Sequence, residues 1–241
     1  MMKKKVLLFA VFFTALIFSC KTAPAFAGAE SDGEVLYRQG RYFLERGDFS
    51  LAERKFMKVI SDFSFSKYEP LATVALGDTF YYRKEYLSAL EVYRRFVKMR
   101  PGHEKTPWAE LQIANSYFAQ RPSSFILLPN PSEKDIEVVE KAVAQYRHYL
   151  NKYPDDDNRV LGLEKLEKAE GILIERDLRV AEFYRKKGHC PAVRMRLKYI
   201  SDNFTVSTEK NRRRIAALNA RCPLITESED TGESEETADE K

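Results

Sequence analysis

An internal repeat with a period of 37 residues is the feature that most restricts how this chain can fold. Glycine, alanine and aromatic positions of one segment recur in the next segment at this constant spacing. The matched pairs are Gly40 with Gly77, Phe43 with Phe80, Phe49 with Tyr86, Ala52 with Ala89, and Phe56 with Tyr93. The repeat predicts units that bury their apolar faces by stacking on one another, because one such unit is too small to enclose a core.

The order of small and aromatic residues within the repeat predicts pairs of helices. It is the tetratricopeptide pattern, in which about 34 residues form one helical hairpin. Small residues such as Ala52 and Ala89 allow the second helix to approach the first, and the aromatic residues fill the wedge between hairpins. Gly47, Gly102 and Gly188 fall between the periodic segments, where turns are expected. We therefore expect an all-α tetratricopeptide superhelix.

Four full hairpins and a partial fifth are expected within residues 33–225. The units cover residues 33–69, 70–105, 106–157, 158–205 and 206–225. The third unit carries an insertion, Gln120–Asp135, whose apolar run Phe125–Leu128 either packs on the scaffold or contacts a partner. The fourth unit begins with one long helix, Arg159–Lys187, and the helix Thr208–Arg221 opens the fifth and would cap the superhelix.

The N-terminal segment predicts export. Lys3–Lys5 precede an apolar run of 13 residues, Val6–Phe18, which is too short to span a bilayer and is typical of a signal peptide. We expect residues 1–19 to be a lipoprotein signal peptide, Cys20 to be the lipidated N-terminus, and residues 20–32 to form a flexible tether. The alternative is cleavage at the site Ala25–Ala27, which would leave no lipid anchor.

Charge is distributed unevenly along the chain. Residues 1–19 carry a net charge of +3, residues 20–226 a net charge of +8, and residues 227–241 a net charge of −7. Basic residues of the body alternate with acidic ones, which is typical of solvated helix faces, so no nucleic-acid partner is expected. Residues 226–241 are acidic and rich in Ser and Thr, and we expect them to form a disordered tail.

The sequence contains no arrangement of residues that is typical of catalysis. His103, His148 and His189 have no ligand-like spacing to one another or to cysteine, so no metal site is expected. There is no nucleophile elbow, no phosphate-binding loop and no dinucleotide fingerprint. These observations favour a binding protein without a cofactor over an enzyme.

Two cysteines would remain after export. Cys190 precedes one predicted helix and Cys222 follows the antiparallel helix beside it, so their side chains are expected to lie close together. In an oxidising compartment they would form a disulfide, which contributes about 3–4 kcal/mol in the loop-entropy treatment. The alternative is two unpaired, partly buried thiols.

The concave face of the superhelix is expected to form a binding groove. In tetratricopeptide arrays this face is lined by residues one turn apart on the first helix of each hairpin. Here these residues are Tyr37, Arg41, Leu44, Val74, Asp78, Tyr81, Trp108, Leu111, Asn115 and Phe118. Such a groove suits an extended peptide with aromatic side chains. The alternative for any single aromatic residue is a place in the core between repeats.

The order of the units resembles the BamD family, lipoproteins of the machinery that assembles β-barrel proteins in the outer membrane of Gram-negative bacteria. The resemblance covers residues 33–221 and rests on Arg100–His103 before the third unit, on the insertion in that unit, and on Val180–Gly188. This last stretch is similar to the family's Val-Ala-Glu-Tyr-Tyr segment. The resemblance implies a lipid-anchored protein on the periplasmic face of the outer membrane, and Lys21 after the lipidated cysteine agrees with sorting to that membrane.

The partners that this resemblance implies are the barrel subunit BamA, unfolded outer-membrane proteins and other lipoproteins of the machinery. The family's fifth repeat has a second helix, which an acidic tail replaces here. Basic residues near the C-terminus form a candidate surface for an acidic partner, with ordinary solvated charge as the alternative: Arg194, Arg196, Lys198, Arg212, Arg213 and Arg214. The competing function is a soluble periplasmic tetratricopeptide adaptor of the cell-division or Tol-Pal type.

Overall fold

The computed structural model describes residues 32–121, 133–204 and 209–222. The predictions for the signal peptide, for Cys20, for the apolar run Phe125–Leu128 and for the acidic tail concern residues outside these ranges. Asp32, expected to end the tether, instead begins the first described helix, where a carboxylate is favoured by the helix dipole. All regular secondary structure in the described ranges is helical, and none of these helices is long and apolar enough to cross a membrane.

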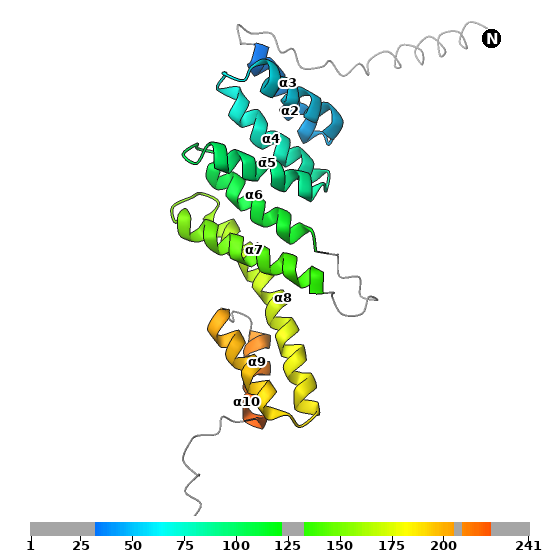
Figure 1. The fold of residues 1–241 in the computed structure, drawn as a ribbon, viewed down its shortest axis with the longest axis vertical. Helices are drawn as coiled ribbons and strands as arrows, with labels where there is room; N and C mark the ends of the chain where they lie inside the picture. Colours follow the sequence, from blue (N-terminus) through cyan, green and yellow to red (C-terminus); the bar gives the residue numbers. More distant parts are fainter. Residues whose placement is uncertain (1–31, 122–132, 205–208, 223–241) are drawn as a thin grey trace, which may run out of the picture.

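Helical hairpins stack in sequence order and form an elongated all-α superhelix (Figure 1). The helices are α2 (Asp32–Glu45), α3 (Phe49–Asp62), α4 (Tyr68–Tyr82), α5 (Tyr86–Met99), α6 (Thr106–Ala119), α7 (Glu133–Lys152), α8 (Arg159–Lys186), α9 (Cys190–Asn203) and α10 (Glu209–Arg221). Within the described residues, consecutive helices pair into four full hairpins, and α10 is the first half of a fifth. The predicted tetratricopeptide architecture is therefore confirmed.

The repeated glycine lets the two helices of a hairpin approach closely. A Cβ atom added to Gly40 would lie 2.5 Å from Cε1 of Phe56, and a Cβ atom added to Gly77 would lie 2.5 Å from Cε1 of Tyr93. Both rings are fully buried. Because carbon atoms in a packed core do not approach so closely, these two positions admit only a residue without a side chain.

Helix α8 takes part in the packing of two hairpins. Its first half packs on α7 and its second half on α9 and α10 (Figure 1). Ion pairs accompany both contacts. Arg147 of α7 donates to the buried carboxylate of Glu170 at 2.5 and 3.0 Å, and Arg214 of α10 pairs with Glu175 and Glu182.

Helix α10 is held at its end by a covalent bond. A disulfide joins Cys190, at the start of α9, to Cys222, directly after α10, and their Cα atoms lie 5.2 Å apart. Leu218 and Cys222 are buried in one apolar cluster with Val193 and Leu197 of α9. The chain therefore leaves the described structure at a fixed point beside the first turn of α9.

Candidate functional site

The first candidate site is a groove of about 710 Å³ near the N-terminal end of the superhelix. It lies between α2, α4 and the start of α6, and we call it the N-terminal groove. Six of the residues predicted for the concave face line it: Tyr37, Arg41, Leu44, Val74, Asp78 and Trp108. The spacing of residues on the first helix of each hairpin therefore brings these six side chains together.

Asp78 is the polar centre of the N-terminal groove. Its Oδ1 atom accepts a hydrogen bond of 2.6 Å from the Tyr93 hydroxyl and one of 3.1 Å from Nε1 of Trp108. Burial raises the pKa of the Asp78 carboxyl, and these two hydrogen bonds only partly oppose that shift. The same contacts hold the indole of Trp108 at the groove wall.

Four residues predicted for the concave face do not line this groove. Leu111 is fully buried in the apolar core, and Asn115 is buried under a 2.6 Å hydrogen bond from the Tyr146 hydroxyl. The prediction fails for these two because α6 is covered by neighbouring helices on more than one side. Tyr81 packs on Tyr86, with ring centroids 5.6 Å apart, and Phe118 packs on Tyr146, with centroids 6.4 Å apart.

Residues from turns complete the N-terminal groove. Glu104 and Lys105 precede α6, and Asp156, Asp157 and Asn158 connect α7 to α8. Helical spacing does not predict these residues, because it relates only residues one turn apart on the same helix. The sequence does contain one indication of them, because three consecutive acidic residues, Asp155–Asp157, fall at a predicted turn.

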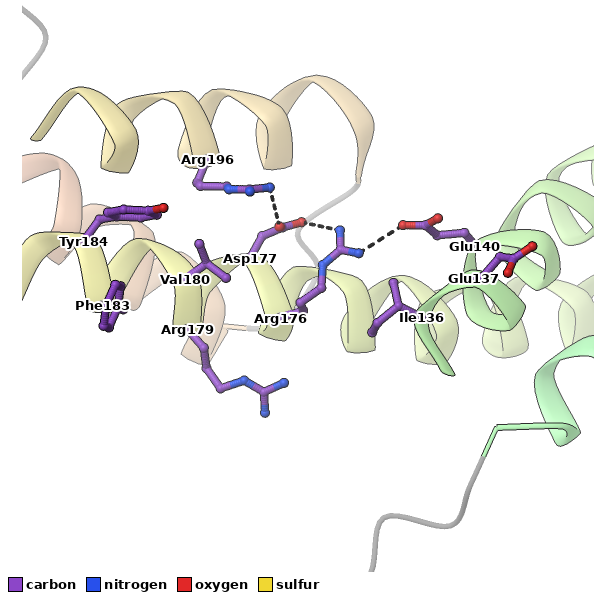
Figure 2. A pocket seen from close by; sticks show the side chains of 10 residues that line it. All are labelled: Ile136, Glu137, Glu140, Arg176, Asp177, Arg179, Val180, Phe183, Tyr184 and Arg196. Atoms are coloured by element: carbon purple, nitrogen blue, oxygen red, sulfur yellow. Dashed lines mark hydrogen bonds and ion pairs between the residues drawn. The ribbon is translucent and has the colours of Figure 1, made fainter. Parts of the chain in front are cut away.

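The second candidate site is a recess of about 680 Å³ between α7, α8 and α9, which we call the C-terminal recess (Figure 2). Asp177 is fully buried at its base and accepts from Nη2 of Arg176 at 3.0 Å and from Nη1 of Arg196 at 3.3 Å. Arg176 also donates to Glu140 of α7 at 3.0 Å. The side chain of Phe183 is 55% exposed at the α8 wall. The recess thus combines a rigid ionic base with an accessible apolar wall.

The six basic residues proposed as a partner surface differ in their surroundings. Only Arg196 lines the C-terminal recess. Arg214 points between helices and pairs with Glu175 and Glu182. The others lie on α9 and α10. Arg212 and Arg213 form ion pairs with Glu209, and Lys198 forms one with Asp202, while Arg194 is partly buried.

Metal binding finds no support in the described ranges. Among residues 32–121, 133–204 and 209–222, no three His, Cys, Asp or Glu side chains are grouped in a way that could hold a metal ion. The arrangement of both sites suits the binding of another polypeptide through apolar contacts and ion pairs.

Comparison with known proteins identifies the family. Residues 29–233 match the family described as "YfiO: Outer membrane lipoprotein". A Vibrio cholerae protein named "Outer membrane protein assembly factor BamD" is 24% identical over 175 residues, covering 72% of this chain and 72% of that protein. The Caulobacter vibrioides protein of the same name is 24% identical over 185 residues, covering 77% of this chain and 58% of that protein.

Two more distant similarities accompany these. The Rickettsia prowazekii protein named "Outer membrane protein assembly factor BamD" is 20% identical over 170 residues, covering 70% of this chain and 64% of that protein. A solved structure, the "TPR2AB-domain:pHSP90-complex of yeast Sti1", is 15% identical with a TM-score of 0.46, covering 78% of this chain and 70% of that chain. Because the family match extends over residues 29–233, this protein belongs to the YfiO family of outer membrane lipoproteins.

Proposed function

We propose that this protein is a non-catalytic assembly factor for outer-membrane proteins, anchored to the periplasmic face of the outer membrane by lipid on Cys20. The observation that carries the proposal is the family match over residues 29–233, joined to two separate recesses on one superhelix. The relatives named "Outer membrane protein assembly factor BamD" align over at least 70% of the chain. A scaffold with two separate recesses can hold two polypeptides at once.

The N-terminal groove would receive an extended segment of an unfolded outer-membrane protein. The rings of Tyr37 and Trp108 offer apolar surface to aromatic side chains of such a client. Arg41 and Lys105, both exposed at the groove, can pair with a client carboxylate. Since Trp108 is already held by Asp78, little side-chain entropy would be lost when the client binds.

The C-terminal recess would hold the periplasmic part of a BamA-like barrel subunit. Phe183 can insert into an apolar pocket of that partner, and Arg179 offers an exposed cation beside it. The Nε atom of Arg196 is buried and makes no hydrogen bond within the described residues. Because this atom is buried, a carboxylate of the partner would pair with the exposed Arg179 guanidinium instead, which would add a charge-assisted hydrogen bond to the apolar contact.

Purification of the tagged full-length protein in mild detergent tests this proposal. The expected result is a diacylated N-terminus at Cys20 by intact mass, together with a large β-barrel protein and lipoproteins of the same machinery. The Cys20→Ala variant should lose membrane attachment while its helical content stays unchanged. Cleavage after Ala27, with a lipid-free N-terminus and no barrel partner, would instead support the soluble adaptor of the cell-division or Tol-Pal type.

A further inference from the structure

The positive charge of the body is concentrated at one end of the superhelix. Residues 20–174 contain 23 basic and 23 acidic residues, whereas residues 175–221 contain 13 basic and 5 acidic residues. Residues 175–221 form the second half of α8 together with α9 and α10, and we call them the C-terminal module. Its net charge of +8 therefore accounts for all of the net positive charge of residues 20–226.

The few acidic residues of the C-terminal module are already engaged inside it. Asp177 is fully buried between two arginines. Glu175 and Glu182 both pair with Arg214, and Glu209 pairs with arginines of its own helix. With eight more cations than anions, the module attracts an acidic segment at short range.

The C-terminal tail starts at the basic corner of this module. Arg221 is exposed and directly precedes Cys222, whose disulfide to Cys190 fixes the root of the tail. Cys190 follows the last turn of α8 closely in sequence, and that turn ends in the exposed residues Lys186 and Lys187. The segment after Cys222 therefore begins beside cations contributed by two helices.

The tail carries the complementary charge. Residues 227–241 contain eight acids and one lysine, a net charge of −7 against the +8 of the C-terminal module. We infer that the tail, residues 223–241, binds back onto the C-terminal module of its own chain through ion pairs. This inference concerns the occupant of the module and stands whether or not the proposed assembly function is correct.

The tail is long enough to reach every cation of the module. Glu227 lies five positions after Cys222, which allows a reach of about 17 Å. Helix α9 has 14 residues and is thus about 21 Å long, so acids beyond Glu227 can reach its far end. A tethered segment acts at an effective concentration of about millimolar, which gives it an advantage over a free acidic partner. Exposed charges are screened over about 8 Å at physiological ionic strength, so the contact is expected to weaken steeply with added salt.

Binding of the tail would control access to the module. The tail sequence after residue 226 holds Ala238 as its only aliphatic side chain and no aromatic one, so its attraction to the module is ionic. An acidic surface of a partner has to displace the tail, whereas anionic lipids and nucleic acids that meet the basic helices by chance are repelled by it. Any anionic ligand of α9 and α10 would therefore need a higher concentration to bind when the tail is present.

Carbodiimide cross-linking of the full-length protein tests the inference, because this reagent joins a carboxylate to a lysine amine only where the two are in contact. Peptide mapping should find links from residues 227–240 to Lys186, Lys187 or Lys198, which are all exposed. The yield should fall roughly fivefold or more in 1 M salt. The matched controls are Lys58 and Lys84, two exposed lysines within residues 20–174, where acidic and basic residues are equal in number. These lysines should give no links to the tail.

Two further measurements make the outcome decisive. In a mixture of isotope-labelled and unlabelled protein, the links should join segments of the same isotope, as an intramolecular contact requires. In the Cys20→Ala background, which removes the lipid anchor, a variant with the eight tail acids changed to Gln or Asn should bind phosphatidylglycerol vesicles roughly tenfold more tightly than a variant with a scrambled but equally acidic tail. Links spread evenly over lysines of all helices, links only between molecules, or equal vesicle binding of the two variants would overturn the inference.

Discussion

The hydroxyl of Tyr93 donates a hydrogen bond of 2.6 Å to Asp78, the residue that directly follows the glycine against which the Tyr93 ring packs. The third hairpin repeats this relationship, since the Tyr146 hydroxyl donates at 2.6 Å to Asn115. A buried hydroxyl on the second helix thus pairs with a polar side chain on the first. This pairing fixes both the orientation of the aromatic ring and its position between the two helices, so the ring cannot move aside when its surroundings change.

Substitution Gly77→Ala is expected to destabilise the protein. The new methyl group would lie 2.5 Å from Cε1 of Tyr93, and the bond to Asp78 prevents that ring from moving away. Overpacking of this kind costs about 1–3 kcal/mol, partly offset by the higher helix propensity of alanine. Chemical denaturation followed by circular dichroism measures the free energy of unfolding.

Gly171→Ala is the matched control for that substitution. Gly171 lies within α8, and a Cβ atom there would meet no atom within 4 Å. Because only helix propensity changes, this variant should gain about 0.5–1 kcal/mol of stability. Equal effects of the two substitutions would show that close approach at Gly77 does not limit stability.

Asp78→Asn should change how stability depends on pH. Burial raises the folded-state pKa of Asp78, so its contribution to stability is fully present below the unfolded-state pKa and is lost as pH rises through the folded-state pKa. Asparagine keeps an oxygen acceptor for Tyr93 and Trp108 but never ionises. The variant should therefore melt at a higher temperature than the wild type at pH 7, and this difference should shrink toward pH 3.

The exposed groove residue Asp157 provides the control for the pH experiment. Asp157→Asn removes the same charge from the rim of the N-terminal groove without affecting a buried carboxyl. Its melting temperature should follow that of the wild type across the same pH range. A difference between wild type and Asp78→Asn that stays constant with pH would contradict the predicted effect of burial.

The disulfide should stabilise the last helix locally. It closes a loop between positions separated by 32 residues, for which the loop-entropy treatment gives about 3–4 kcal/mol. The double variant Cys190→Ser, Cys222→Ser should lose amide hydrogen-exchange protection in α10, while α2–α7 keep theirs. Non-reducing peptide mapping should recover the two cysteines in one linked peptide, and two thiols that alkylate freely in the native protein would contradict the bond.

The two recesses should bind different ligands. Phe183→Ala combined with Arg179→Glu should weaken binding of the barrel partner at least about tenfold while client-peptide binding stays unchanged. Trp108→Ala should have the opposite effect, because it removes the aromatic wall of the N-terminal groove. Both affinities can be measured by surface plasmon resonance with immobilised protein. Arg196 is left intact because it also holds the buried Asp177.

Exposed positions away from both recesses supply the controls. Lys58→Glu makes a charge change on α3, and Leu87→Ala removes a side chain on α5 that is 73% exposed. Neither residue lines the N-terminal groove or the C-terminal recess. A loss of either affinity in these variants as large as in the recess variants would exclude the assignment of the two sites.

The helical architecture could be predicted from the sequence because its spacing is local and repeated. Arg41, Asp78 and Asn115 occupy equivalent positions 37 residues apart, yet only the first two reach the N-terminal groove. Asp78 and Asn115 both accept a hydrogen bond from a tyrosine hydroxyl of the second helix, but Asn115 is buried by its neighbours whereas Asp78 stays partly exposed. Such contacts join residues of different helices, and periodicity within one helix does not report them.

The C-terminal recess was not predicted for a related reason. Asp177 lies in a stretch of alternating charges, where an acidic residue is normally solvated. Its burial results from α8 extending beyond α7 to meet α9, and this is a property of helix length and packing in three dimensions. The basic residues of α9 could be recognised in the sequence, but the carboxylate that orders Arg196 could not.

The uninterrupted course of α8 also determines how the two recesses can influence each other. Asn158, immediately before α8, lines the N-terminal groove, and Phe183, near its end, lines the C-terminal recess. These two residues are 25 positions apart, which corresponds to about 38 Å along an α-helix. The backbone hydrogen bonds of a helix resist stretching, so α8 keeps a constant length. A ligand bound at one end of α8 can therefore affect the other end only through a tilt or rotation of the helix. A polypeptide held in the groove would therefore be released at a set distance from whatever occupies the recess.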